Sequence, residues 1–258
     1  MVGAIEFSGV KKSFRRPDGE IVHALNGVDL KIEQGDFVCL IGPSGCGKST
    51  MLRLLAGLDQ PTEGAVYLDG EKITRPNCDR GLVFQDPNLF PWLNIYDNIS
   101  FGLRARHIFK QKRDSVREFM DLVGLTGFEK SYPHQLSGGM LQRIMIGIAT
   151  SMKPSLLIAD EPTTAIDAIT QFEILDELLR IKQEHQTAMV FISHDLNAIS
   201  RVADRIVVLN QGLVVDQGDF QHILHHATDS YTKLLVEKRT DVMRRYSQVL
   251  GGKERVYA

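Results

Sequence analysis

The chain has 258 residues, a formal net charge of -2 and an isoelectric point of about 6.4. This length suits one large domain or a domain with an inserted subdomain. The near-neutral charge argues against broad nucleic-acid binding, which usually requires a basic surface. No apolar run reaches the roughly 20 residues that cross a bilayer, and the amino-terminal residues lack the apolar segment of a signal peptide. We therefore expect a cytosolic protein that meets a membrane only through a partner.

The amino-terminal part of the chain has the pattern of a β-rich region. Alternating apolar and polar side chains predict strands at 4–14 and 21–32. A hairpin is predicted at 64–73, because Asp69 and Gly70 form a turn dipeptide between two alternating segments.

A glycine-rich loop lies between a predicted strand at 34–42 and a predicted helix at 49–58. Its sequence, GPSGCGKST, matches the phosphate-binding pattern G-x-x-x-x-G-K-[ST] in the strand–loop–helix context that the motif requires. Glycines let backbone N–H groups face phosphate oxygens, Lys48 supplies positive charge, and Ser49 offers a hydroxyl to Mg²⁺. The predicted nucleotide-binding residues here are Gly42, Pro43, Ser44, Gly45, Cys46, Gly47, Lys48, Ser49 and Thr50. The loop does not name the reaction, because kinases, GTPases and transport ATPases all use it.

The rest of the chain alternates between helical and strand patterns. Apolar residues at helical spacing predict helices at 98–109, 113–125 and 139–152. Short apolar runs predict strands that are buried on both faces, at 155–160 and 188–193. The segments around them predict helices and a final hairpin, at 170–185, 195–203 and 205–219. This order predicts an α/β fold in which a parallel sheet carries a helical insertion.

Several predicted strands end in residues that suit phosphate or metal chemistry. Asp160 suits Mg²⁺, directly or through water, and Glu161 suits a general base that activates water beside a γ-phosphate. Gln85 follows another apolar strand and can reach Mg²⁺ or the attacking water, and His194 can bond a γ-phosphate. Acidic turns and single histidines are also common at strand ends for structural reasons. Because parallel strand ends converge on one crevice, and Lys48 lies there too, we expect a shared site.

A second helix start with phosphate-binding character occurs in QLSGGMLQR, residues 135–143. Ser137 can cap the helix, Gly138 and Gly139 leave backbone N–H groups open, and an apolar-periodic run follows. Such a helix start is a ready anion site. The sequence therefore predicts two phosphate cradles in one chain.

Taken together, these motifs resemble the nucleotide-binding subunit of an ATP-binding cassette (ABC) transporter, over residues 4–225. The motifs occur in the order of that family. They are Phe14 (adenine stacking), 42–50 (Walker A), Gln85 (Q-loop), LSGGM at 136–140 (signature), LLIADE at 156–161 (Walker B with its glutamate), AID at 165–167 (D-loop) and His194 (H-loop). The signature separates this family from other phosphate-loop proteins. Phe14 replaces the commoner tyrosine and keeps an aromatic face for stacking.

The resemblance implies a specific fold and assembly. The implied fold is an α/β, phosphate-loop (RecA-like) core with a parallel sheet, an N-terminal antiparallel β subdomain and an inserted α-helical subdomain. The ABC ATPase domain would span 1–240, with the helical subdomain at about 88–152, and 241–258 would form a tail. Two subunits, identical or homologous, would pack head to tail around two ATP molecules and Mg²⁺.

The resemblance also implies a role for each motif residue. The signature of one subunit would close over the γ-phosphate held by the Walker A loop of the other, so the second cradle serves the partner's ATP. The residues of that shared contact are Ser137, Gly138 and Gly139, and Asp167 of the D-loop is a further implied nucleotide-binding residue. The implied catalytic residues are Glu161, His194 and Gln85. The implied Mg²⁺ ligands are Ser49, Gln85 and Asp160.

The segment 85–103 is unusually apolar and aromatic for a loop region. Its large side chains cannot all be buried by so short a stretch, and they are Leu89, Phe90, Trp92, Leu93 and Tyr96. In the resembling family this region receives a coupling helix of the membrane subunit, and exposed apolar patches usually mark interfaces. The alternative is that these side chains cover the subunit's own helical insertion.

Two sequence signals disagree about the transported solute. Residues 76–103 resemble the nitrate, sulfonate and taurine importers, whereas LSGGMLQRIMI and LLIADEPTTAID lean toward dipeptide and nickel importers. We expect the ATPase subunit of a bacterial-type importer of a small anion, at the cytoplasmic face of the inner membrane. Its expected partners are permease subunits and, indirectly, a solute-binding protein, with no nucleic acid. The open alternatives are a soluble non-transport ABC ATPase, an exporter or lipoprotein-release ATPase, and a peptide or nickel as solute.

Overall fold

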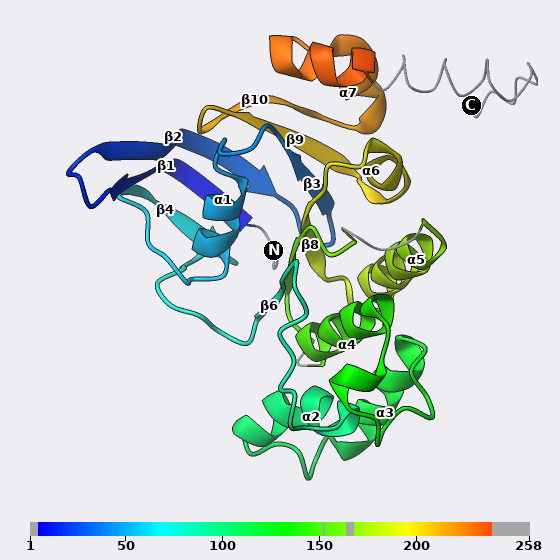
Figure 1. Cartoon of the computed structure of the whole chain (residues 1–258). Coiled ribbons are helices and arrows are strands. Elements are labelled where there is room, and N and C mark those ends of the chain that lie inside the picture. The colour runs from blue at the N-terminus through cyan, green and yellow to red at the C-terminus, as the bar shows by residue number, and fades with distance from the viewer. Residues whose placement is uncertain (1–4, 152, 164–167, 239–258) are drawn as a thin grey trace, which may run out of the picture.

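The computed structural model describes residues 5–151, 153–163 and 168–238 (Figure 1). Within these residues, six strands form the central sheet in the order β10-β9-β3-β8-β7-β6. Its parallel strands are β3 (Phe37–Ile41), β6 (Arg80–Val83), β7 (Leu156–Asp160), β8 (Ala188–Ile192) and β9 (Arg205–Asn210). The edge strand β10 (Leu213–Gly218) pairs antiparallel with β9. The parallel strands bring their carboxyl ends to one edge of the sheet.

A second, antiparallel sheet precedes the central one in the chain. In the described region its order is β2-β1-β4-β5, formed by β1 (Ile5–Arg15), β2 (Ile21–Ile32), β4 (Glu63–Leu68) and β5 (Glu71–Lys72). The predicted turn between β4 and β5 is present, with Asp69 and Gly70 both in the left-handed region at φ 55° and 79°. This conformation suits Gly and Asp, which explains the position of the hairpin.

The two faces of the central sheet carry different cores. Along β3 the side chains alternate, so that Phe37 and Cys39 join one buried cluster while Val38 and Leu40 join the other. One cluster includes side chains of helix α1 (Lys48–Leu55) and of the antiparallel sheet, so α1 lies between the two sheets. The other face is covered by further helices, among them α5 (Ala168–His185), α6 (Leu196–Val202) and α7 (Phe220–His226).

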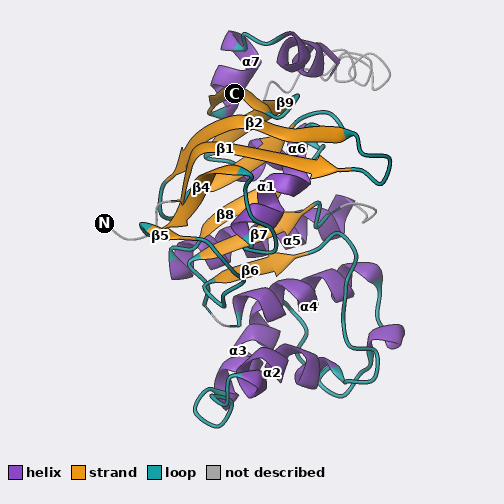
Figure 2. Cartoon of the chain, turned by 90° about the vertical axis from the view of Figure 1, so that its left-hand side faces the viewer, coloured by secondary structure: helices purple, strands orange, loops and turns teal. Residues whose placement is uncertain are grey.

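A helical layer is inserted between β6 and β7. It contains α2 (Ile95–Ala105), α3 (Arg113–Leu122), a short 3₁₀ helix (Pro133–Gln135) and α4 (Gly138–Thr150). Figure 2 shows α2, α3 and α4 as a layer beyond the edge strand β6. This arrangement carries the start of α4 away from α1 (Figure 1).

The predicted helix at 98–109 is wrong at both ends. Helix α2 starts at Ile95, because the Asn94 side chain caps it by accepting a hydrogen bond from the Asp97 N–H at 2.7 Å. It ends at Ala105, and His107 has a positive φ of 59°, which no α-helix accommodates.

The predicted fold class is confirmed in each of its parts: a parallel core sheet, an antiparallel amino-terminal sheet and inserted helices. The domain limits at 240 and at about 88–152 stay predictions, and the proposed tail 241–258 lies outside the described residues. In the described part of the chain, no helix combines the length and apolarity that a bilayer crossing needs.

Candidate active site

The phosphate-binding loop runs from the end of β3 into α1 with a tightly packed backbone. A Cβ on Gly42 would lie 2.2 Å from the Leu209 carbonyl oxygen, and one on Gly47 would lie 2.6 Å from the Ala24 carbonyl oxygen. Gly47 is also the N-cap of α1, in the left-handed region at φ 111°. Glycine at these two positions is therefore required by the loop's own surroundings.

Lys48 is a buried cation at the start of α1. Its side chain is 7% exposed, and its Nζ donates to the carbonyl oxygens of Gly42 at 2.8 Å and Pro43 at 3.0 Å. Its charge adds to the positive end of the helix dipole at the same place. The loop therefore offers anions both backbone N–H groups and a fixed ammonium group.

A cleft of about 230 Å³ lies over this loop and brings most of the predicted residues together. Its lining combines residues of the loop with residues that follow β7 and β8. The lining residues are Ala24, Ser44, Gly45, Gly47, Lys48, Ser49, Thr50, Asp160, Glu161, Ile192 and His194. The carboxyl ends of β3, β7 and β8 thus meet at one site, as the strand pattern predicts.

Asp160 ends β7 in a partly buried position beside Ser49. Burial raises the pKa of the Asp160 carboxyl above its usual range, and the negative charge of Glu161 raises it further. A hydrogen bond from Ser49 and the charge of Lys48 oppose this rise. A carboxylate in this setting is stabilised by a bound cation.

Glu161 follows Asp160 in a conformation that is uncommon for a side chain of its size, at φ 48°. Its backbone N–H donates to the Ile192 carbonyl at 3.1 Å, which ties the turn after β7 to the end of β8. Its Oε1 lies 2.6 Å from Nε2 of His194. The two candidate catalytic side chains are therefore already in contact.

Several predicted residues lie outside the lining of this cleft, among them Gly42 and Pro43 of the loop itself. Gln85 is exposed in the segment after β6 and is not part of the lining. Cys46 is buried in the loop, with its Sγ 3.8 Å from Lys48 Nζ. Phe14 lies on β1 and is 39% exposed, and Asp167 falls outside the described residues.

The sequence patterns missed Lys12, which lies beside Phe14. Its Nζ is 4.9 Å from the centre of the Phe14 ring, a cation–π distance. The ammonium is held by Asp59 Oδ1 at 2.6 Å and by the Gln60 carbonyl at 2.8 Å. Residues i and i+2 of a strand share a face, and that spacing was the available signal.

The signature segment starts α4, as the cap pattern predicts. Ser137 is the N-cap, and its hydroxyl accepts a long hydrogen bond of 3.4 Å from the Met140 N–H. Ser137 and Gly138 are exposed, whereas Gly139 is buried against Thr170. None of Ser137, Gly138 and Gly139 lines the cleft over the phosphate loop of the same chain.

The aromatic segment before α2 is divided between burial and exposure. Leu89 and Tyr96 pack against the chain's own core, whereas Trp92 is 71% exposed. The rings of Phe90 and Trp92 are 5.5 Å apart, and those of Phe90 and Phe101 are 4.6 Å apart. We call Phe90, Trp92 and Phe101 the aromatic patch. Leu89 and Tyr96 therefore cover the chain's own core, and docking on a membrane subunit stays a prediction for the aromatic patch.

Comparison with known proteins identifies the family. The family model described as "ABC transporter" matches residues 25–164. An aliphatic sulfonates import ATP-binding protein of Bacillus thuringiensis is 42% identical over 206 residues, covering 80% of this chain and 81% of that protein. The chain belongs to the ABC transporter family. A nitrate import ATP-binding protein of Synechococcus elongatus is 43% identical over 224 residues, covering 86% of this cassette and 81% of that protein.

Solved cassette structures agree with this assignment. A dimeric ATP-binding cassette in a post-hydrolysis state, bound to ADP and Pi, matches with a TM-score of 0.74 and 33% sequence identity. The match covers 83% of this chain and 98% of that one. This ABC cassette is accordingly an ATP-binding protein and an ATPase.

Proposed function

We propose that this ABC ATPase powers the import of a small oxyanion, a sulfonate or nitrate, as one of two cassettes that work on the membrane subunits of an importer. The observation that carries the proposal is that only one of the chain's two phosphate-binding helix starts lines the cleft. Lys48, Ser49 and Glu161 share one cleft, while the signature helix starts outside that cleft. The solute class follows the sulfonate and nitrate relatives, whose similarity covers most of this chain.

In the proposed reaction the cleft residues position and stabilise charge. Lys48 and the loop N–H groups hold the terminal phosphates, and Glu161 Oε1 takes a proton from the water that attacks the γ-phosphate. His194, 2.6 Å from Glu161, orients that carboxylate and bonds the γ-phosphate. Gln85 enters from the exposed segment after β6, so its contribution requires that segment to move toward the cleft.

The oxygen donors of the cleft suit Mg²⁺. Ser49 and Asp160 share a hydrogen bond, and the raised pKa of the Asp160 carboxyl reflects burial and the nearby Glu161. Mg²⁺ sites need hard oxygen ligands and a carboxylate whose negative charge is not fully neutralised by cations of the protein. We assign Ser49 and Asp160 as its protein ligands, and Mg²⁺ would neutralise phosphate charge there. Gln85 remains a proposed third ligand.

The proposed assembly is a head-to-tail dimer. Exposed Ser137 and Gly138 present a capped helix start with open N–H groups, which suits the γ-phosphate of a partner chain's ATP. Asp167 is proposed to join the same interface. The similarity to a dimeric cassette bound to ADP and Pi supports this arrangement.

The proposed membrane partner binds at the aromatic patch. Trp92 and Phe101 are 71% and 46% exposed, and together with Phe90 they form a contiguous apolar surface that spans α2 and the segment before it. Aromatic anchors of this kind suit a helix of a permease subunit. This contact would hold the cassette at the cytoplasmic face of the inner membrane, with a solute-binding protein acting on the other side.

Uptake assays in the host test this proposal. We expect deletion of the gene to abolish uptake of a labelled alkanesulfonate or of nitrate, and wild-type protein to restore it. The Glu161→Gln variant should accumulate normally and fail to restore uptake. Labelled dipeptide and Ni²⁺ are tested in parallel, because DEPTTAID leans toward those importers. Loss of dipeptide or Ni²⁺ uptake alone would move the solute assignment, and unchanged uptake of all four would contradict the importer.

A further inference from the structure

The turn that carries Trp92 is held by a buried side chain from α2. The Leu93 N–H donates to the Phe90 carbonyl at 3.1 Å, which closes a β-turn with Pro91 and Trp92 at its two central positions. Proline at the first central position fixes its own φ in the range that such turns need. The most exposed ring of the aromatic patch thus projects from a closed turn.

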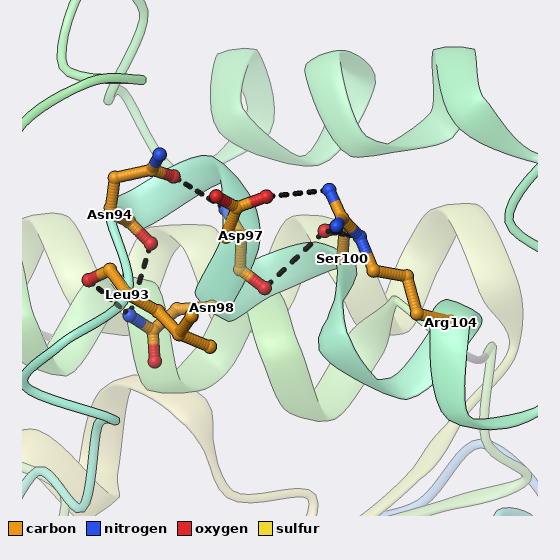
Figure 3. A network of polar contacts seen from close by, with 6 residues as sticks. All are labelled: Leu93, Asn94, Asp97, Asn98, Ser100 and Arg104. Carbon is orange, nitrogen blue, oxygen red and sulfur yellow. Dashed lines mark hydrogen bonds and ion pairs between the residues drawn. The ribbon is translucent and has the colours of Figure 1, made fainter.

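Asn98 is the side chain beneath this turn. It is 1% exposed, and its carbonyl oxygen accepts from the Phe90 N–H at 2.9 Å. Its amide nitrogen lies 3.2 Å from the Phe90 carbonyl oxygen, 3.0 Å from that of Leu93 and 3.0 Å from that of Asn94. Figure 3 shows the amide pointing at the Leu93 and Asn94 carbonyls. One carboxamide therefore bonds both ends of the turn and the residue after it.

The chemistry of these contacts favours asparagine over its closest analogues. Aspartate has the same shape but no donors, and it would face the carbonyl oxygens of Phe90, Leu93 and Asn94 with negative charge. Alanine would remove this donor from all three carbonyls, and although those of Phe90 and Asn94 would keep the backbone N–H groups of Leu93 and Asn98, the link from α2 to the turn would be lost. Leucine would fill the space and bond nothing. Of these side chains, only the amide of Asn98 matches the N–H and carbonyl groups of the turn in this shape.

The base of the turn is also fixed, so that Asn98 acts on a defined segment. The N–H groups of Ile95 and Tyr96, in the first turn of α2, donate to the carbonyls of Ser131 and Glu129 at 2.9 and 3.1 Å. Asn94 caps the same helix start. The segment between β6 and α2 is therefore fixed at its α2 end by these bonds and at Phe90 and Leu93 by Asn98, and Trp92 lies in the part that Asn98 holds.

We propose that Asn98 is a positioning residue that presets the Phe90–Leu93 turn, and with it Trp92, in the shape that docks on the membrane partner. This inference rests on the proposed function for the identity of the partner. A turn that is ordered before contact loses less conformational entropy on binding, so the affinity is higher than for a free loop. Asn98 contributes nothing to nucleotide chemistry, because neither it nor its partners line the nucleotide cleft.

The test distinguishes an effect on the turn from loss of folding and from the absence of a membrane partner. Trp92 is the only tryptophan of the chain, so its fluorescence reports on this turn alone. The variants are Asn98→Ala, the exposed Pro91→Gly, which loosens the turn from its other side, and Ser100→Ala. Ser100 is a matched control on α2: it is fully buried and, among the residues that the structure describes, bonds the Asp97 carbonyl and Arg104 (Figure 3).

Membrane binding is measured with urea-washed inside-out vesicles from a host strain that lacks the gene, with protein-free liposomes of the same lipids as the control. We expect Asn98→Ala to weaken vesicle binding about tenfold, equivalent to about 1.4 kcal/mol. Pro91→Gly should weaken it about threefold through the entropy of the free turn. Acrylamide quenching of Trp92 should rise in both variants, and Ser100→Ala should stay within about twofold of wild type.

Basal ATP hydrolysis of each variant, which we expect to stay within about twofold of wild type, verifies that the chain is folded. Unchanged Trp92 quenching and unchanged vesicle affinity in Asn98→Ala and Pro91→Gly would overturn the inference, as would equal effects from Ser100→Ala. If wild-type protein binds vesicles no better than liposomes, the proposed membrane partner is contradicted. In that case Trp92 quenching still decides whether Asn98 holds the turn.

Discussion

The two helix starts with phosphate-binding character, those of α1 and α4, differ in what surrounds them. Helix α1 has a glycine cap without a side-chain hydrogen bond, and its first residue, Lys48, is buried in the cleft with Ser49, Asp160 and Glu161. Helix α4 has a Ser137 cap that is exposed, and none of its first residues lines that cleft. The first start is equipped for phosphate within its own chain, whereas the second is directed outward.

The glycines of the two starts make the same distinction. Cβ atoms on Gly42 and Gly47 would approach backbone oxygens within 2.2 and 2.6 Å, and one on Gly139 would approach Thr170 Cγ2 at 2.3 Å. A Cβ on Gly138 would meet no atom within 4 Å. Contacts within the chain therefore explain Gly42, Gly47 and Gly139, and a positive φ of 78° explains Gly45, whereas neither explains Gly138. The proposed contact with a phosphate held by a second chain would supply the missing reason.

The largest effect on turnover is expected for Glu161, the proposed general base of the α1 cleft. Glu161→Gln should lower MgATP turnover about a thousandfold, because it removes the general base while keeping the side chain's shape. The same variant should accumulate as an ATP-bound dimer, visible by size-exclusion chromatography with and without ATP. Glu184→Gln on α5, whose exposed carboxylate pairs with Arg180, is the matched control and should stay within about twofold. Unchanged turnover in Glu161→Gln would remove this residue from its assigned role.

A charge at the α4 start should affect hydrolysis and spare nucleotide binding. We expect Ser137→Arg to lower turnover about a hundredfold, because it would block the donors that we propose bind the partner's γ-phosphate. The affinity of the monomeric chain for a fluorescent ATP analogue should stay unchanged, since Ser137 lies outside its own cleft. Ser200→Arg, an exposed substitution on α6, controls for added charge. Weakened nucleotide binding by the monomer would break the distinction between the two starts.

The two neighbouring glycines of the signature allow a sharper comparison of folding with hydrolysis. Gly138→Ala should leave stability unchanged or raise it by about 0.5 kcal/mol, as alanine is the better helix former, yet lower turnover about tenfold. Gly139→Ala should destabilise the chain by about 1 kcal/mol, because its Cβ would overlap Thr170. Urea unfolding and ATPase assays on both variants make the measurement. Full turnover in Gly138→Ala would leave that glycine without a role at the interface.

The smallest effect is expected for the ionised Asp160 carboxyl in the α1 cleft. Burial and Glu161 raise the folded-state pKa of the Asp160 carboxyl above its unfolded value, so its ionised form opposes folding at neutral pH. Without Mg²⁺, Asp160→Asn should therefore stabilise the chain by about 0.5 kcal/mol at pH 7. The gain should shrink as the pH falls through the raised pKa, where the wild-type carboxyl is protonated. Urea unfolding at pH 7 and pH 5 tests both statements, and a destabilised Asp160→Asn would contradict them.

Local pattern was sufficient to predict most of the cleft. The loop at 42–50 follows a strand whose residues are all buried, Asp160 ends a strand that is buried up to that residue, and His194 follows another fully buried strand. Chain order and apolar runs therefore specify where they meet. Gln85 lies outside the lining of the cleft, in the exposed segment after β6, and its place at the site stays a prediction. The strand end sets the position of a residue, whereas the path of the following segment sets its direction, and that path depends on tertiary contacts.

The start of α2 shows what the sequence pattern could not supply. The helix was expected from Asn98, but Asn94 caps it four residues earlier, and Asn98 is buried inside the first turns. From the sequence alone, a polar residue such as Asn98 would be placed on the exposed face of a helix whose apolar face packs on the core. The partners that bury Asn98 are backbone carbonyls of a turn, which no side-chain pattern reveals. Lys12 was missed for a related reason, because Asp59, which holds it, is distant in sequence.

Mixing two inactive variants tests the division between the helix starts most directly. Lys48→Ala removes the cation of the α1 start and should weaken ATP binding about thirtyfold, and Ser137→Arg blocks the α4 start. Each variant alone should be nearly inactive. A mixed dimer joins the intact α1 start of one chain to the intact α4 start of the other, so an equimolar mixture should recover about a quarter of wild-type turnover. A mixture as inactive as its components would show that both starts must belong to one chain, and would contradict the shared site.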